Sequence, residues 1–544
     1  MAPSFRNPSF HQRARRPLAY AALFAAALLL ALAAAYYHDL KRGSVHSPEV
    51  YKILCEEAFG PFFSETAPGS GRYRAVRRMA LAEEFSMPKP AGVRRVFILG
   101  ESVAEILGSG RQYFPPGEGV ELINCGMGGY DSVRILAALR EVLNYSPDLV
   151  VILSGNNESM TEIACPGLAD GFRRRRRRLL EKRLGALKAS LSLHRENLEK
   201  MAAAAEKAGV PAVFCTLPAN MADMPPRAPL QLGDPQFALA YRYYHEGNYA
   251  RALELLEKGL SNREEGADLQ LYAARALEKL GRREEAAGRC LQMKDEETGI
   301  LKRNAMIREL GRGRGRCVAD LDLYFSRQAG GLPGFEQFTD GVHWRGRYNA
   351  PVVGEILRAA VACGPKLPPP APVPAPAEEA EALASLNYAV NWMDGGYPGE
   401  AALAQLAWLR KKAPALLEKA AASPAGLPRL VIVNSRSFGG VLDPGQVYPR
   451  LLAHLAELER RSGARKEALS LIDRALSFEP GDRSFRLVRA QVLHGLGRTA
   501  AAEKEFLDLA SAPDARGEAL GLAAAYGAIA PERAARKGEP GEAR

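Results

Sequence analysis

The hydrophobic and polar positions change their spacing several times along the chain, and the first regular pattern is an alternation of strands and helices. Short apolar runs rich in β-branched and aromatic residues, each ending in a turn, occur at residues 94–100, 120–126, 147–155 and 210–218. Segments between them, such as SVRILAALREVLNY, carry apolar residues at helical spacing. Apolar strands that alternate with helices are typical of a parallel sheet buried on both faces. The pattern therefore predicts an α/β fold with its sites at the carboxyl ends of the strands.

A second pattern, with a period of 34 residues, interrupts this alternation. Gly247 and Gly281 stand 34 residues apart, as do Ala252 and Ala286, within two helical segments. Small residues at such positions let paired helices approach closely, and stacking of the pairs buries faces that no single repeat can bury. We interpret residues 233–300 as tetratricopeptide-like repeats inserted into the α/β domain.

Strand character returns at residues 317–325, and a helix follows before a proline-rich segment at residues 364–379. This composition predicts an extended linker. Beyond the linker, Gly463 and Gly497 repeat the 34-residue spacing. The pattern predicts a second, C-terminal array of tetratricopeptide-like repeats.

Residues 17–37 form an apolar segment without a charge, long enough to cross a bilayer core of roughly 30 Å. Four arginines precede it and two basic residues follow it, so the positive-inside rule predicts a cytoplasmic N-terminus. We expect a single-pass membrane anchor with the bulk of the chain extracytoplasmic, in the periplasm or on the cell surface. The alternative is a secreted protein whose signal peptide is cleaved, since Ala33–Ala35 can serve as a cleavage site.

These patterns divide the chain into a series of segments. They are a basic cytoplasmic N-terminus (1–16), the transmembrane anchor (17–37), a juxtamembrane segment (38–91), the two parts of the α/β domain (92–225 and 315–363), the inserted repeats (233–300), the linker (364–379), the C-terminal repeats (380–515) and a polar tail (516–544). The predicted fold class is α/β, a parallel sheet flanked by helices, combined with all-α arrays and one N-terminal transmembrane helix.

The formal net charge of +11 comes from two short segments. Residues 1–42 contribute +5, and a run of six arginines contributes +6; these are Arg173, Arg174, Arg175, Arg176, Arg177 and Arg178. Because the remainder is neutral overall, the chain lacks the broad basic face that binds duplex nucleic acid. The arginine run is a solvated basic segment in one interpretation. In the other, it binds a polyanion such as an acidic polysaccharide or anionic lipid.

The chain has seven cysteines, and export would permit disulfides between them. None lies in a CxxC or Cys/His spacing that binds zinc, so we expect no metal and no cofactor. Cys125, Cys215 and Cys317 lie in or beside apolar strand-like runs, which favours a role as core residues.

Residues suited to acyl transfer follow the predicted strands. Ser102 lies at a strand-to-helix turn after Gly100, which exposes its hydroxyl at the carboxyl edge of the sheet, and Asn157 follows the third strand. The second strand runs into the glycine-rich loop NCGMGGYDS, whose backbone N–H groups can face a ligand. Far along the chain, Asp340 and His343 form an Asp-x-x-His motif. Together these residues supply a nucleophile, oxyanion donors, a base, and an acid that orients the base.

Four motifs in this order resemble the SGNH (GDSL-like) hydrolase superfamily over both parts of the α/β domain. The resemblance implies a flavodoxin-like layering of sheet and helices. It implies a catalytic triad of Ser102, Asp340 and His343, and an oxyanion hole of Ser102, Gly129 and Asn157. Gly126 or Gly128 takes the place of Gly129 if the loop registers differently.

The chain departs from the family pattern at Glu101 and Glu158, where the family has aspartates. We expect a membrane-anchored, extracytoplasmic serine esterase or acyltransferase that forms an acyl-enzyme, with an envelope or secreted polysaccharide as one substrate class. Its expected partners are an acylated glycan, a protein bound by the repeats, and the membrane, but not nucleic acid. The alternative is a repeat-based scaffold of an envelope complex that carries a catalytically retired SGNH domain.

Overall fold

The computed structural model describes residues 57–158, 178–179, 181–226, 230–261, 266–364, 366–395, 399–431, 441–512 and 517–530. The predicted anchor at residues 17–37 and the arginines from Arg173 to Arg177 lie outside these ranges, while Arg178 is exposed. None of the helices within these ranges combines the length and the apolar character that a membrane crossing requires.

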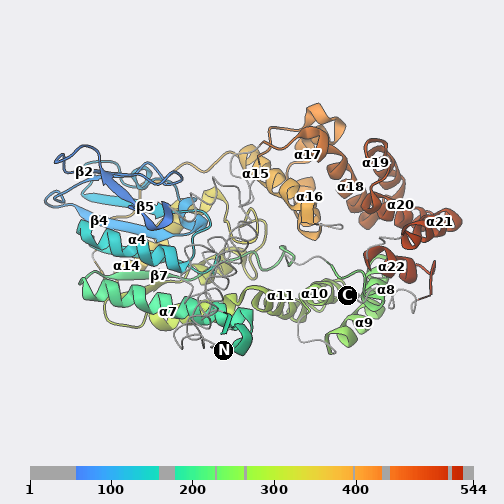
Figure 1. Cartoon of the computed structure of the whole chain (residues 1–544), viewed down its shortest axis with the longest axis horizontal. Helices are drawn as coiled ribbons and strands as arrows, with labels where there is room; N and C mark the ends of the chain where they lie inside the picture. The colour runs from blue at the N-terminus through green and yellow to red at the C-terminus, as the bar shows by residue number, and fades with distance from the viewer. Residues whose placement is uncertain are drawn as a thin grey trace, which may run out of the picture.

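Five parallel strands form the central sheet of the α/β domain (Figure 1). They are β4 (Arg94–Gly100), β5 (Val120–Gly126), β6 (Leu149–Leu153), β7 (Ala212–Cys215) and β8 (Arg316–Ala319), in the spatial order β5-β4-β6-β7-β8. This confirms the predicted parallel α/β fold, and the strand order is the flavodoxin-like one. In such sheets ligands bind where the strand order reverses, which here is beside the carboxyl end of β4.

Helices cover both faces of this sheet, because successive side chains of each strand point to opposite faces and both sets are apolar. The helices are α3 (Ser102–Glu105), α4 (Ser132–Val142), α7 (Ala186–Lys207), α12 (Ile300–Leu310), α13 (Leu321–Ala329) and α14 (Asn349–Ala360). Phe97 and Leu99 of β4 share one core with residues of α4, α7 and α12. Val96 and Ile98 share the opposite core with residues of α3, α13 and α14.

A small antiparallel sheet lies in the segment that the sequence pattern assigned to a juxtamembrane region. Its strands are β1 (Phe63–Glu65), β2 (Arg72–Ala75) and β3 (Glu84–Ser86). Phe63 and Phe85 belong to the same core as Phe97 of β4, and the Glu141 carboxylate of α4 accepts the Phe63 backbone N–H at 2.9 Å. Residues 57–91 therefore pack as part of the α/β domain.

The predicted strand at residues 317–325 divides into β8 and α13. The Asp320 carboxylate accepts the backbone N–H of Leu323, and this N-cap starts the helix directly after the short strand. Cys317 of β8 belongs to the core, as predicted, and it also forms a disulfide with Cys363, which follows α14. Cys125 and Cys215 are buried free thiols, as predicted.

Helices also form in both segments that carry the 34-residue period. The inserted array contains α8 (Pro235–His245), α9 (Tyr249–Ser261), α10 (Ala267–Lys279) and α11 (Arg283–Thr298). The C-terminal array contains α15 (Glu378–Asn391), α16 (Glu400–Lys412), α17 (Pro414–Ala422), α18 (Pro444–Ser462), α19 (Arg465–Phe478), α20 (Arg483–Gly495), α21 (Thr499–Ser511) and α22 (Gly517–Ala525). Gly247, Gly281, Gly463 and Gly497, which mark the 34-residue period, all have positive φ at turns after helices, a conformation that favours glycine.

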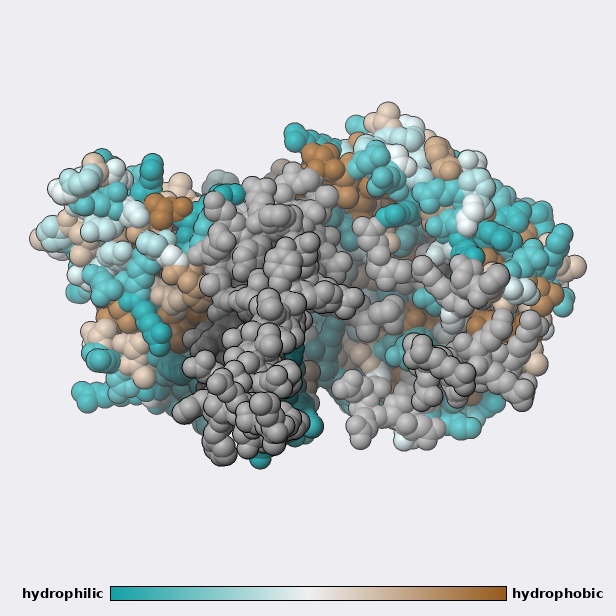
Figure 2. All heavy atoms as spheres, viewed as in Figure 1, coloured by the Kyte–Doolittle hydropathy of each residue, from teal (hydrophilic) through white to brown (hydrophobic). Residues whose placement is uncertain are grey.

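The two arrays meet and form one continuous helical body, with α22 beside α8 (Figure 1). Tyr241 of α8, Phe506 of α21 and Leu522 of α22 share one apolar core. The approach is so close at Gly521 that a Cβ there would stand 1.8 Å from the carbonyl oxygen of Leu232. On the face shown in Figure 2, hydrophilic side chains cover most of the C-terminal helices, as expected of helices that bury their apolar sides against one another.

The proline-rich linker lies against the α/β domain before it reaches α15. The backbone N–H of Ala371 donates to the carbonyl oxygen of Tyr113 at 2.8 Å, and Leu367 and Val373 pack against the core on the α14 side of the sheet. The linker thus leads the chain along the α/β domain to α15, where the C-terminal array begins.

Candidate active site

Ser102, His343 and Asp340 form a continuous hydrogen-bonded chain. The distance from Ser102 Oγ to His343 Nε2 is 2.7 Å, and the distance from His343 Nδ1 to Asp340 Oδ2 is also 2.7 Å. The fold brings the serine and the histidine together across 241 residues of sequence. This geometry fits a nucleophile, a base, and an acid that holds the base in the tautomer with the proton on Nδ1.

Local structure holds each member of this triad in place. Ser102 is the first residue of α3 and follows β4 after a single residue, so it stands at the carboxyl edge of the sheet. Residues 340–343 form a loop that is closed by a β-bridge between Phe338 and Trp344. Both of these aromatic side chains are buried in the core, which anchors the loop on either side of the imidazole.

The Asp340 carboxylate is buried but remains an acceptor. Its Oδ1 accepts the backbone N–H of Val342 at 2.9 Å and that of His343 at 2.7 Å. Burial alone would raise the pKa of Asp340, but the His343 side chain and these N–H donors outweigh burial and lower the pKa below its ordinary value. An ionised Asp340 can therefore stabilise the imidazolium that forms when His343 takes a proton.

The loops after β5 and β6 flank Ser102, because these strands lie on either side of β4. Gly126 donates its N–H to Asn124 Oδ1 at 2.9 Å, and Gly128 donates its N–H to the Glu105 carboxylate. Gly129 has a positive φ of 71°, and no described residue accepts its N–H. Among the three glycines that the sequence left open, Gly129 stays the predicted oxyanion donor, because Gly126 and Gly128 already have acceptors for their N–H groups.

Asn157 follows β6, and the loop that carries it is tied to the nucleophile turn by Glu101. The fully buried Glu101 carboxylate accepts the N–H of Gly155 at 2.5 Å, the N–H of Asn156 at 3.0 Å, and the N–H of Asn157. Burial, with the nearby Glu158 charge, raises the pKa of Glu101 to about 8. The glutamate thus links the residue before the nucleophile to the loop that carries the predicted oxyanion amide.

Glu158 lies at the centre of a second buried cluster beneath this loop. Its carboxylate accepts the Ser132 hydroxyl at 2.8 Å and the Ser154 hydroxyl at 3.3 Å. Burial, and then Asp131, raise the pKa of Glu158 to about 7, although Arg303 acts in the opposite direction. Burial also lowers the pKa of His194 well below its ordinary value, so its 3.7 Å contact with Glu158 is between a neutral imidazole and the acid.

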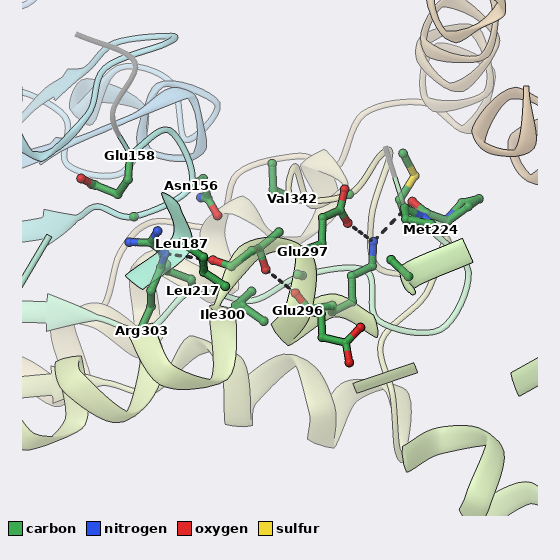
Figure 3. A pocket seen from close by; sticks show the side chains of 18 of the residues that line it. Asn156, Glu158, Leu187, Leu217, Met224, Glu296, Glu297, Ile300, Arg303 and Val342 are labelled. Carbon is green, nitrogen blue, oxygen red and sulfur yellow. Dashed lines mark hydrogen bonds and ion pairs between the residues drawn. The ribbon is translucent and has the colours of Figure 1, made fainter. Parts of the chain in front are cut away.

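A cavity of about 610 Å³ lies beside the loop at residues 340–343, here called the catalytic loop (Figure 3). Its wall includes Asn156 from the loop after β6 and Val342 from the catalytic loop. Glu297 of the inserted array and Arg303 of α12 line it from the other side. The inserted array therefore reaches the edge of the active site. Arg303 could not be predicted as a lining residue of this cavity, because no recognisable sequence motif surrounds it.

The C-terminal array also reaches the site, through Tyr388 of α15. The Tyr388 and His343 rings are stacked, with centroids 6.2 Å apart and planes inclined by 27°. Gln405 of α16 donates to the backbone carbonyl of Thr339 at 3.0 Å, at the start of the catalytic loop. Sequence reasoning missed Tyr388, because its proximity to His343 depends on the docking of two distant segments.

Comparisons with known proteins give only distant likenesses. No protein-family model matches the chain, and no curated protein matches it. A solved GDSL-like lipase from Bacteroides thetaiotaomicron is 17% identical, with 51% of this chain and 92% of that chain covered and a TM-score of 0.28. The crystal structure of TesA is 16% identical, with 50% of this chain and 99% of that chain covered and a TM-score of 0.23. TM-scores this low do not define a family or a function for the chain, so the function is inferred from the geometry of the site.

Proposed function

We propose that this chain is a serine hydrolase of the SGNH type that cleaves or transfers ester-linked acyl groups. The observation that carries the proposal is the hydrogen-bonded chain from Ser102 through His343 to the buried Asp340. In the reaction, His343 Nε2 takes the proton of the Ser102 hydroxyl while Oγ attacks the ester carbonyl carbon. The leaving alkoxide then takes that proton from His343, and an acyl-enzyme remains.

The negative oxygen that forms during this attack needs donors that are already in place. The backbone N–H groups of Ser102 and Gly129 and the side-chain amide of Asn157 are the proposed donors, from the three adjacent strand ends. Water, or a hydroxyl of a sugar, attacks the acyl-enzyme with His343 again as the base. The acid is released in the first case and a new ester forms in the second, so hydrolysis and acyl transfer use the same groups.

Export from the cytoplasm belongs to the proposal. The Cys317–Cys363 disulfide supports an oxidising compartment, and the apolar segment at residues 17–37 supports a membrane anchor. An acylated envelope or secreted glycan is the proposed substrate class, and the helical body is the proposed binding surface for a protein partner. Retention of the protein in a carbonate-washed membrane fraction would distinguish an anchor from a cleaved signal peptide.

The size of the helical body favours one second candidate, a scaffold whose α/β domain no longer catalyses. The two candidates differ in the reactivity of one hydroxyl. A triad with an activated serine reacts with a fluorophosphonate probe, whereas a scaffold does not.

The test is therefore labelling and ester cleavage by the full-length protein and its Ser102→Ala variant. We expect the wild type to be labelled, and the variant to lose labelling and at least about 10³-fold in kcat on any ester that the wild type cleaves. Ser477→Ala, which changes an exposed serine of α19, is the matched control and should keep both. A wild type without labelling, or a Ser102→Ala variant with full activity, would overturn the proposal.

A further inference from the structure

The catalytic histidine is covered by a residue from outside the α/β domain. Tyr388 of α15 stacks on His343, and its side chain is half-buried at the site. No described residue forms a hydrogen bond with the Tyr388 hydroxyl, although Asp340 and Glu105 lie close enough for their charges to raise its pKa further after burial. The phenol is therefore a neutral donor with two carboxylates nearby, those of Asp340 and Glu105.

One face of α15 is fixed on the α/β domain. Glu381, Ser385 and Tyr388 follow the spacing i, i+4, i+7, which places them on the same side of the helix. The buried guanidinium of Arg345 lies 3.7 Å from Glu381 and 3.5 Å from the Ser385 hydroxyl, and it stacks 3.8 Å from the ring centroid of Trp408. Because Arg345 also donates from Nε to a backbone carbonyl of its own domain at 2.7 Å, the position of Tyr388 is set by the same segment that carries His343.

Glu105 supplies an acceptor that lies near both His343 and Tyr388. It stands on α3, one turn after Ser102, and is half-buried. Its carboxylate accepts the N–H of Gly128 and interacts with His343, while burial raises its pKa. A carboxylate can accept several hydrogen bonds, so Glu105 can also take a donor from a ligand.

We propose that Tyr388 and Glu105 form a polar wall of the substrate site that binds a hydroxyl group of an uncharged sugar or polyol ester, an inference that rests on the proposed esterase function. A ligand hydroxyl accepts from the Tyr388 phenol and donates to the Glu105 carboxylate, so it satisfies both. A simple alkyl ester offers the Tyr388 hydroxyl no acceptor and the Glu105 carboxylate no further donor, which costs binding free energy. An anionic ligand is repelled by Glu105 and Asp340.

The experiment compares the acetyl and butyryl esters of glucose with those of ethanol, on the full-length protein, and follows the release of acid. We expect the wild type to favour the glucose esters in kcat/KM. Tyr388→Phe keeps the ring over His343 and removes the hydroxyl, so it should lower the glucose-to-ethanol ratio of kcat/KM by about 5- to 10-fold, the effect of one hydrogen bond. Glu105→Gln should lower the ratio in the same direction.

Two further variants separate this role from a structural one. Tyr388→Leu removes the ring as well and should lower kcat on both alcohols by about tenfold or more, through misplacement of His343. Tyr243→Phe removes a hydroxyl that contacts Arg251 in the inserted array and should leave the ratio unchanged. Rescue of kcat by Phe but not by Leu would show that the ring positions the imidazole.

The outcomes also separate this inference from the proposed function. An active wild type whose glucose-to-ethanol ratio is unchanged in both Tyr388→Phe and Glu105→Gln would overturn this inference alone. A preference for esters of glucuronic acid over those of glucose would overturn the uncharged substrate class. A wild type that cleaves no ester and does not label at Ser102 would overturn the proposed function and this inference with it.

Discussion

Two clusters of buried carboxylates, one beside the active site and one between the helical arrays, differ in the direction of their pKa shifts. Beside the site, burial and then the neighbouring Glu158 raise the pKa of Glu101 to about 8, and burial and then Asp131 raise that of Glu158 to about 7. Burial alone would also raise the pKa of Glu400 and Glu457, which lie between the arrays. Arginine partners there outweigh it and lower each pKa to about 2.

The difference lies in what each carboxylate accepts. Glu101 accepts backbone N–H groups of the Asn157 loop, which position that loop without neutralising a charge. Glu457 accepts from Arg460 at 2.6 Å and from Arg461 at 2.6 Å. Raised carboxylate pKa values from burial in a cleft are typical of functional sites, whereas a fully paired ion network is typical of a structural seam. In these four glutamates the direction of the pKa shift thus follows whether the carboxylate is hydrogen-bonded to arginine side chains.

The largest expected effect comes from breaking the buried ion network between the two helical arrays. Glu457→Gln removes the charge that pairs two buried arginines and should lower the free energy of unfolding by about 3–5 kcal/mol. Chemical denaturation measures this change. Glu459→Gln, two residues further along α18, removes a partly exposed partner of Arg410 and should cost less than about 1 kcal/mol. Equal costs for the two variants would show that the buried network is no more important than a surface pair.

A change of pH should act on the two clusters in opposite directions. Glu101 and Glu158 have folded pKa values above the ordinary 4.5, so their contribution to stability is fully present below pH 4.5 and is lost as the pH rises through about 7 and 8. Glu400 and Glu457 have lowered values, so their contribution is present above pH 4.5 and is lost as the pH falls through about 2.

Hydrogen exchange with mass spectrometry, corrected for intrinsic rates, can follow both clusters in one sample. Peptides over residues 149–158 should lose protection as the pH rises above about 8, while peptides of α16 and α18 should keep it. Near pH 3 the peptides of α16 and α18 should lose protection, while those over residues 149–158 should keep it. Loss of protection in both regions at the same end of the pH range would contradict the electrostatic difference between them.

The parts of the fold that could be predicted are those whose signal is local. β4 and β5 coincide with the runs at 94–100 and 120–126, because a long apolar strand ending in glycine needs no distant partner to be recognised. The antiparallel strands within residues 57–91 are three or four residues long. They are held in part by Glu141, far along the chain, which no local pattern reveals. At residues 317–325, the N-cap of Asp320 outweighed the strand character of the apolar run.

The same distinction applies to the site. Ser102, Asp340 and His343 could be predicted because each lies in a short motif whose place at a strand end or in a loop follows from the chain order. Tyr388 could not, because its place depends on how a linker and a helical array dock on the α/β domain. Arg303 and the cavity that it lines depend in the same way on how the inserted array returns to the sheet.

The smallest effect, and the sharpest test of the contrast, is expected for Glu101→Gln. If Glu101 is mostly protonated near pH 7, as its raised pKa implies, a neutral amide of the same length should cost less than about 1.5 kcal/mol of unfolding free energy, the net value of one hydrogen bond. Glu101→Ala leaves the N–H groups of the Asn157 loop without their acceptor and should cost more, with a lower kcat because the loop is no longer held. Chemical denaturation and ester cleavage measure the two effects side by side. A Glu101→Gln variant as unstable as Glu457→Gln would mean that both carboxylates are ionised in the folded protein, and the difference between the two clusters would not hold.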